Sequence, residues 1–537
     1  MPFSLINDPW LPVRRAHSGA TTIRPSQLTE NITTDPVIAI DWPRADFRLA
    51  SLEFLIGLLA IACPPTGRRD WPDLYHNPPS PAVLESAFAP LGFAFELDGD
   101  GPRFMQDFED LAAGENDVAN LLIEAPGEQT TKKNADLLNK RGQVIKLSRA
   151  SVAMALFTLQ TYAPAGGAGN RTGLRGGGPL TTLVMPPGPT PLPLWHLLWA
   201  NVPNGEPATL AELPAILPWL TKTQTSENDK KVAPVPGEEA QAFWGVPRRI
   251  RLDFTPSESD EICDLTGAAD NVMVRTWRQR PNGANYDGFK HPLTPYYNPK
   301  PKEQLWLPVH PQPDGIGYRH FLGLVFAPGA SSASLQPAAT ILAWRNHRRH
   351  AVEIEGNARW RILAGGFDMD NMKARGFVEA ELPVTDVADL AQMALYDETL
   401  AGLIRGADEV ASLLRQAVRG ALFSEGSKPD IKAGLFNNLR AQFWQETEAA
   451  FYREAARAAR GAPLGDVSSG FLQSLRQTAL RLFDEAAPIT ASDHPDRVAH
   501  AAKWLGLALS GYGKAGGALF SALGLEAREA KPKRKSA

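Results

Sequence analysis

One stretch divides the chain into two kinds of structure: Gly365-Gly366-Phe367-Asp368-Met369-Asp370-Asn371-Met372-Lys373-Ala374-Arg375. The preceding residues, 360–364, predict a short strand, whereas from Thr385 onward apolar residues recur with the 3.6-residue period of helices. Two glycines after a strand allow the backbone to turn sharply and to lie close to another surface. Because Asp and Asn side chains bond to nearby backbone in turns, we expect an exposed, shaped loop, a common location for functional residues.

The same stretch has other interpretations. Asp368, Asp370 and Asn371 supply hard oxygen ligands, so a metal site or a metal-dependent nuclease that uses the two aspartates is one alternative. The calcium-loop template requires a glycine at its sixth position, where Lys373 stands. An ordinary polar turn at a domain junction is the simplest alternative.

Composition indicates a globular protein. The chain has 537 residues, of which 43% are hydrophobic and 21% charged, enough for two or more domains. Its net charge is −4, so binding to nucleic acid would require local basic patches or a partner. The two cysteines, Cys63 and Cys263, are too few for a disulfide framework and are typical of a reducing compartment. The most apolar segment, 49–63, contains Glu53 and is shorter than the ~20 residues of a membrane span, so we expect a soluble, cytoplasmic protein.

The order of the periodic segments predicts an α+β protein. Residues 1–380 predict a mixed N-terminal domain of strands and helices, residues 381–525 a C-terminal helical bundle, and residues 526–537 a basic disordered tail. The expected helices of the bundle are 386–405, 407–422, 430–460, 468–486 and 495 to about 523.

A glycine-rich segment, 165–178, follows an expected helix and precedes an expected strand. A P-loop would require a lysine, and none is present; a dinucleotide-binding loop would run from strand to helix. What remains is bare backbone flanked by Arg171 and Arg175, which suits a phosphate backbone or a DNA groove, or a flexible connection.

Basic residues gather in three further places. The polar run 125–149 is either a solvated loop or an arm that touches nucleic acid. The strand 249–254 alternates polar and apolar residues and places its arginines on one face, and 272–280 again combines arginines with an aromatic residue.

With these motifs in view, the chain resembles the CasA family, the large subunits of the type I-E CRISPR surveillance complex, Cascade. The resemblance rests on the opening 5–13, on Gly173-Leu174-Arg175-Gly176-Gly177-Gly178-Pro179-Leu180-Thr181-Thr182, on the Gly-Gly-Phe-Asp-Met-Asp-Asn stretch, and on the terminal helices. It implies a mixed N-terminal domain and a C-terminal four-helix bundle, without catalytic activity or cofactor. The expected partners are the other Cascade subunits, crRNA, double-stranded target DNA and a helicase-nuclease. The family reads the protospacer-adjacent motif, promotes strand separation and R-loop formation, and recruits the helicase-nuclease. A pure protein scaffold is the further alternative.

The resemblance also assigns residues. The motif-reading glycine loop falls on Gly166, Gly167, Ala168 and Gly169, and a basic groove contact falls on Arg278 or Arg280, between which the sequence does not decide. The strand-separating wedge falls on Asp370 and Asn371, where relatives often carry a longer glutamine.

A loop that docks on the guide-RNA end of the complex corresponds to 130–141. Its expected contact residues are Lys132, Lys133, Asn134, Lys140 and Arg141. Some relatives carry a zinc-binding cysteine cluster near Cys263; because a single cysteine stands here, we expect no zinc.

Overall fold

The computed structural model describes residues 2–67, 69–136, 141–167, 169–188, 190–237, 239–303, 305–327, 334–352, 359–370, 372–385, 387, 390–424 and 434–528. The chain forms two compact units. The first comprises Met1–Pro313 with Gln336–Glu381, and the second comprises Asp314–Leu335 with Leu382–Ala537. The segment Asp314–Leu335 therefore groups with the C-terminal helices.

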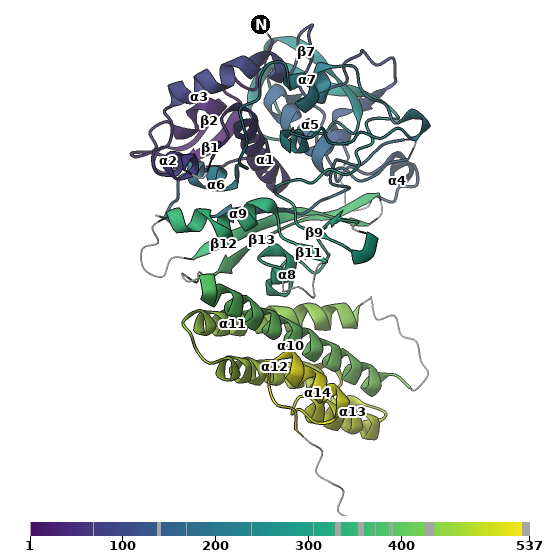
Figure 1. Cartoon of the computed structure of the whole chain (residues 1–537). Helices are drawn as coiled ribbons and strands as arrows, with labels where there is room; N and C mark the ends of the chain where they lie inside the picture. Colours follow the sequence, from purple (N-terminus) through teal and green to yellow (C-terminus); the bar gives the residue numbers. More distant parts are fainter. Residues whose placement is uncertain are drawn as a thin grey trace, which may run out of the picture. The chain divides into compact units, whose positions relative to one another are not determined.

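Three of the sheets lie largely in the first unit (Figure 1). An antiparallel sheet has the order β2-β1-β3, a second has the order β13-β12-β6, and in a third β8 pairs with β4, β5 and β7. The strands are β1 (Leu11–Arg15), β2 (Gly19–Ile23), β3 (Val37–Ile40), β4 (Glu115–Asp117), β5 (Leu147–Ser148), β6 (Thr181–Met185), β7 (Arg249–Ile262), β8 (Ala269–Arg280), β12 (Trp360–Asp370), β13 (Lys373–Val384) and the two-residue strands β9 (Tyr296–Tyr297), β10 (Leu307–Pro308) and β11 (Leu335–Gln336).

The core of the first unit surrounds α1 (Ala45–Ala62), a helix that is apolar on nearly every side and almost wholly buried. It packs against α5 (Arg149–Tyr162) and α6 (Leu194–Asn201). No helix in the described part of the chain is long and apolar enough to span a membrane. The other helices of the unit are α2 (Asp70–His76), α3 (Pro81–Phe88), α4 (Glu128–Lys132), α7 (Leu213–Ile216) and α9 (Ala339–Asn346).

The glutamate in the middle of α1 has a structural partner. Glu53 forms a buried ion pair with Arg175, at 2.6 Å, and accepts hydrogen bonds from Tyr162 and Thr181. Arg175 also donates to the hydroxyl groups of Thr181 and Thr294. Arg175 is therefore not available to a phosphate backbone, one of the possibilities that the glycine-rich segment left open, because this guanidinium is 3% exposed and pairs within the core.

The stretch that divides the sequence is a β-hairpin and not the exposed loop that we expected. β12 continues to Asp370 and β13 begins at Lys373, so most of the stretch belongs to two strands. Gly365 and Gly366 are buried within β12, where a side chain on Gly366 would overlap the backbone carbonyl of Pro179. The glycines therefore permit close packing of backbone against backbone, as the sequence indicated, but they make no turn.

The C-terminal unit is the expected helical bundle, and the α+β class is confirmed (Figure 1). Two helices expected separately are one, because Gly406 continues the helix, and the expected last helix is two, because Gly511 and Gly513 adopt positive φ angles. Tyr318 stacks on Phe451 with ring centroids 4.4 Å apart, which explains why its segment belongs to this unit. The helices are α8 (Phe321–Leu324), α10 (Leu390–Leu422), α11 (Leu435–Ala459), α12 (Leu464–Ala486), α13 (Pro495–Ala508) and α14 (Gly513–Ala522).

Candidate nucleic-acid interface

The glycine loop that follows α5 is a closed turn. The Gly166 amide donates to the Asn170 carbonyl at 3.0 Å, and the Asn170 amide donates to the Gly167 carbonyl at 3.3 Å. Gly169 has a φ angle of +75°, a conformation that favours glycine. Ala168, the fourth predicted residue of the loop, lies outside the described residues.

Neighbouring segments fix this loop at its second half. The Gly169 carbonyl accepts the backbone N–H of Asn282 at 3.1 Å, and a side chain on Gly169 would overlap that of Asn282. The Asn170 side chain accepts a hydrogen bond from Gln279 of β8. At the other end, Arg248 donates to the Pro164 carbonyl at 2.6 Å. The loop is thus held by contacts to β8 and to the residue before β7.

Gly167 differs from the other glycines of the loop. It is exposed, and a Cβ atom added to it would meet no described atom within 4 Å. The described contacts of the fold therefore do not require a glycine at this position. A bare backbone at an exposed, anchored turn allows close approach by a second molecule.

The β7–β8 ribbon presents two different faces. Arg249 pairs with Arg280 and Arg251 with Arg278 in the antiparallel register, while Ile250 pairs with Gln279. Because successive side chains point to opposite faces of a strand, the four arginines share one face and Gln279 lies on the other. The expectation that the arginines of 249–254 share a face is confirmed.

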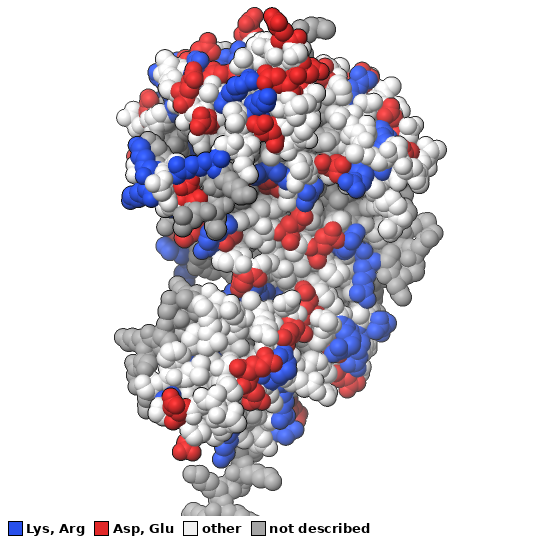
Figure 2. All heavy atoms as spheres, turned by 180° about the vertical axis from the view of Figure 1, so that it is seen from behind, with Lys and Arg blue, Asp and Glu red and all other residues white. Residues whose placement is uncertain are grey.

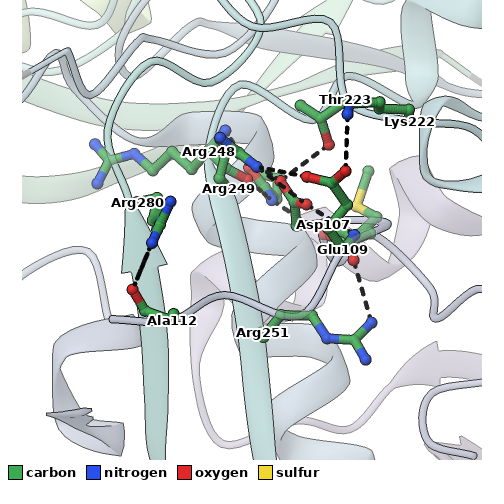
Figure 3. A network of polar contacts seen from close by, with 11 residues as sticks. Asp107, Glu109, Ala112, Lys222, Thr223, Arg248, Arg249, Arg251 and Arg280 are labelled. Carbon is green, nitrogen blue, oxygen red and sulfur yellow. Dashed lines mark hydrogen bonds and ion pairs between the residues drawn. The ribbon is translucent and has the colours of Figure 1, made fainter. Parts of the chain in front are cut away.

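An acidic segment covers the arginine face (Figure 3). Arg249 pairs with Asp107 at 2.7 Å, Arg251 with Asp110 at 2.8 Å, and Arg280 donates to the Ala112 carbonyl at 2.8 Å. Arg278 pairs with Asp253 of β7 at 3.0 Å. The hydrogen bond to Asp107 raises the pKa of Arg249. Arg278 and Arg280 thus have partners within the fold, on the face opposite to the residue that holds the glycine loop.

The predicted wedge lies at the hairpin tip. Asp370, the last residue of β12, is 66% exposed, and Arg375 of β13 lies 4.0 Å from its carboxylate. Asn371 lies outside the described residues. Arg375 instead pairs closely with the buried Asp368, at 2.8 and 2.9 Å, and this hydrogen-bonded pair raises the pKa of Arg375. Two strands therefore present Asp370 at an exposed position.

The predicted docking loop has exposed lysines and an internal ion pair. Lys132 ends α4, and it, Lys133 and Asn134 are exposed. Arg141 pairs with Asp136 at 2.6 Å and also donates to the Asn134 side chain at 3.2 Å. Lys140 lies outside the described residues. Lys132 and Lys133 are thus exposed here, and Arg141 forms an ion pair within the loop.

Two further features bear on the chemistry. Among the described residues, no group of three or more His, Cys, Asp or Glu side chains is arranged to hold a metal ion. Cys263 is buried, and its thiol lies 3.3 Å from the hydroxyl of Ser151. Basic and acidic side chains are interspersed on the face shown in Figure 2. With a net charge of −4, any contact of this chain with nucleic acid would be made by local basic groups.

A family model described as CRISPR-associated protein Cse1 matches residues 4–482. This chain belongs to the Cse1 family. Among solved structures, CasA of Thermus thermophilus is 17% identical with a TM-score of 0.65, over 94% of this chain and 99% of that one. Cse1 of Acidimicrobium ferrooxidans is 15% identical with a TM-score of 0.65, over 98% of each chain. A chain of a structure described as a CRISPR RNA-guided surveillance complex is 15% identical with a TM-score of 0.67, over 95% of this chain and 99% of that one. At these identities the structures show that the Cse1 fold is shared.

Two contacts of the glycine loop were missed by sequence reasoning, namely those from Gln279 and Arg248. The first was within reach, since strand alternation places Gln279 on the face opposite to Arg278 and Arg280. No sequence signal points to Arg248, because its contact to Pro164 joins segments 84 residues apart.

Proposed function

We propose that this chain is the non-catalytic large subunit of a type I-E CRISPR RNA-guided surveillance complex that acts in the cytoplasm. In this role it binds the other Cascade subunits and crRNA, reads the protospacer-adjacent motif of double-stranded DNA, and promotes strand separation and R-loop formation. It then recruits a helicase-nuclease. Membership of the Cse1 family supports the proposal, as does the description of one structural relative as a surveillance complex.

The observation that carries the motif-reading role is the anchored glycine loop with its bare residue Gly167. Contacts at Pro164, Gly169 and Asn170 hold the turn, whereas the outer backbone at Gly167 is open. A minor groove is about 6 Å wide and admits backbone more readily than bulky side chains. Readout there is degenerate, so a backbone loop tolerates several related motifs.

The hairpin tip supplies the proposed wedge. Parting one base step costs a few kcal/mol, which a rigid support for Asp370 and Asn371 can offset in part before guide pairing takes over. A nuclease that uses Asp368 as a metal ligand is disfavoured by the pairing of both carboxylate oxygens of Asp368 with Arg375. A pure scaffold would act independently of the DNA motif.

The first test measures binding of target duplex by the guide-loaded complex, with and without this chain, on DNA with a randomised motif. We expect the chain to add a motif-dependent gain in affinity. Gly167→Asp should abolish the motif preference through bulk and charge repulsion, because the groove is lined by phosphates. Gly101→Asp is the matched control, since Gly101 is also exposed with no described atom within 4 Å of an added Cβ. Equal affinity for all motifs in the wild type would overturn the proposal.

A further inference from the structure

The arginine at the base of the glycine loop lacks a counter-charge. Arg248 is partly buried, and its guanidinium donates to the Pro164 carbonyl at 2.6 Å. Its Nε atom is buried and has no hydrogen-bond partner among the described residues. No carboxylate in the described part of the chain pairs with this guanidinium. The two arginines that follow in β7, Arg249 and Arg251, both have aspartate partners.

Figure 3 shows how differently these neighbours are placed. Arg249 points toward Asp107, whereas Arg248 extends away from Asp107 and Glu109. Arg248 bonds to the glycine loop at Pro164, and Gln279 bonds to it at Asn170. Two side chains thus reach the loop, and one of them is a cation.

An unpaired, partly buried cation is unfavourable for the isolated fold. Burial lowers the pKa of Arg248 to about 10, so the guanidinium is still charged at neutral pH. Its charge is not needed to hold Pro164, because a neutral donor would make the same hydrogen bond. A charged group that the fold does not neutralise is favourable once an anion binds beside it.

The surroundings favour a phosphate group as that anion. Gly167 leaves the outer surface of the loop open to a second molecule, and the second arginine near the loop, Arg171, is engaged with the hydroxyl of Ser226 at 3.0 Å. Guanidinium groups donate charge-assisted hydrogen bonds to phosphate oxygens, and the terminal nitrogen of Arg248 that does not bond to Pro164 can serve as the donor.

We propose that Arg248 binds one backbone phosphate of the target duplex beside the glycine loop, and so anchors the DNA while the loop lies in its groove. This inference rests on the proposed function, because it takes the loop as the motif reader. Arg248 lies outside the set of site residues predicted from the sequence. In this arrangement Gly167 lets the loop enter the DNA groove, and Arg248 binds the DNA backbone. On the opposite face, Arg249, Arg251 and Arg278 have Asp107, Asp110 and Asp253 as partners.

The test pairs protein variants with DNA that lacks one phosphate charge. Guide-loaded complexes containing the wild type, Arg248→Met or Arg248→Lys are titrated with target duplexes that carry a single methylphosphonate at successive positions in and around the motif. We expect one position at which the methylphosphonate weakens wild-type binding about tenfold and has no further effect on Arg248→Met. The dependence of log K on log salt should also become shallower by about 0.9 in Arg248→Met.

Two variants guard against a purely structural explanation. Arg251→Met removes an arginine from the opposite face, whose partner Asp110 is 91% exposed, and should keep the methylphosphonate pattern and the salt slope of the wild type. Arg248→Lys keeps the charge and should keep the salt slope even if its affinity falls. If Arg248→Met fails to assemble, the same cycle with Arg248→Gln, which keeps a donor but removes the charge, decides: loss of the position-specific effect supports the contact, and full retention overturns it.

The outcomes separate this inference from the proposed function. Motif-independent binding by the wild type would overturn both. Motif-dependent binding with the same methylphosphonate pattern in wild type and Arg248→Met would overturn the phosphate contact alone. Weaker assembly of Arg248→Met with guide RNA, with an unchanged DNA pattern, would assign the cation to RNA and also overturn it.

Discussion

At the scale of the residue, the glycines of the two family motifs have one physical role, close packing of backbone. A Cβ on Gly177 would lie 2.7 Å from the Pro164 backbone, and side chains on Gly178 and Gly366 would overlap the carbonyls of Phe367 and Pro179. The two motifs therefore pack against each other, and the similarity that revealed the family is largely a similarity of core packing.

Arg175 likewise has a role in core packing, in this case through its charge. Its position in a glycine-rich stretch suggested an anion site, but it is the partner of the buried Glu53. By contrast, Asp370 and Gly167 are exposed, and few contacts within the fold account for the identity of these two residues. Exposure separates the residues available for DNA from those that hold the core.

The wedge makes a prediction at this scale. Asp370→Ala combined with Asn371→Ala should slow R-loop formation on linear duplex about tenfold, which corresponds to about 1.4 kcal/mol of lost wedge contact. Binding to DNA whose motif-proximal pairs are already mismatched should be unchanged, because no base step needs to be parted. Strand separation can be followed by permanganate reactivity of the displaced strand; an equal loss on both substrates would contradict the wedge.

At the scale of the element, local sequence predicted where helices and strands form but not where they break. Gly406 does not end α10, because its missing side chain accommodates Leu523 from the residues after α14. The hairpin of β12 and β13 likewise continues through residues whose composition favours a turn, because β6 and the Pro179 backbone lie alongside. In both cases tertiary contacts outweigh local propensity.

The segment Asp314–Leu335, which groups with the C-terminal helices, contains a histidine that should make stability depend on pH. Burial and the nearby Arg319 lower the pKa of His320 to about 4, from an ordinary value near 6.5. Above pH 6.5 the imidazole is neutral in the folded and unfolded states. Between pH 6.5 and 4 the unfolded state binds a proton that the folded state does not, so the folded state loses up to about 3 kcal/mol as the pH falls.

Unfolding of the wild type and of His320→Gln can be compared from pH 7 to pH 4. Carboxylates contribute to both proteins, so the informative quantity is the difference between their unfolding free energies. We expect the advantage of the wild type to shrink by about 3 kcal/mol over this range. His500→Gln, at an exposed helical position, is the control; a difference that does not change with pH would refute the prediction.

At the scale of the whole molecule, much of the basic charge is neutralised inside the fold. Asp107 and Asp110 cover the arginine face of the β7–β8 ribbon, and Asp368 holds Arg375. A subunit of net charge −4 can therefore contact nucleic acid at a few local points, provided that guide pairing and sister subunits supply most of the affinity.

The exposed lysines of the predicted docking loop predict an effect on assembly. Lys132→Ala combined with Lys133→Ala should weaken association with the rest of the guide-loaded complex about tenfold at moderate salt, because each lysine contributes long-range attraction to RNA phosphates. The stability of the chain itself should change by less than about 0.5 kcal/mol, since both side chains are exposed. Retention by the tagged complex measures assembly.

The control for assembly is Lys300→Ala with Lys302→Ala, two exposed lysines elsewhere in the first unit. Equal retention of both double variants would remove the docking role from the 130–141 loop. Loss of retention that does not respond to salt would indicate a contact other than RNA phosphate.

The sequence by itself determined the α+β class, the helical bundle, the burial of the segment around Glu53 and the family, because periodicity and short motifs are local properties of the chain. Tertiary structure alone decided which charges are neutralised. Arg175 and Arg278 look alike in sequence to Arg248, but the first two pair with carboxylates and the last has no carboxylate among the described residues. Whether a cation is neutralised depends on what packs against it, and Glu53 and Asp253 reach these arginines only through the fold.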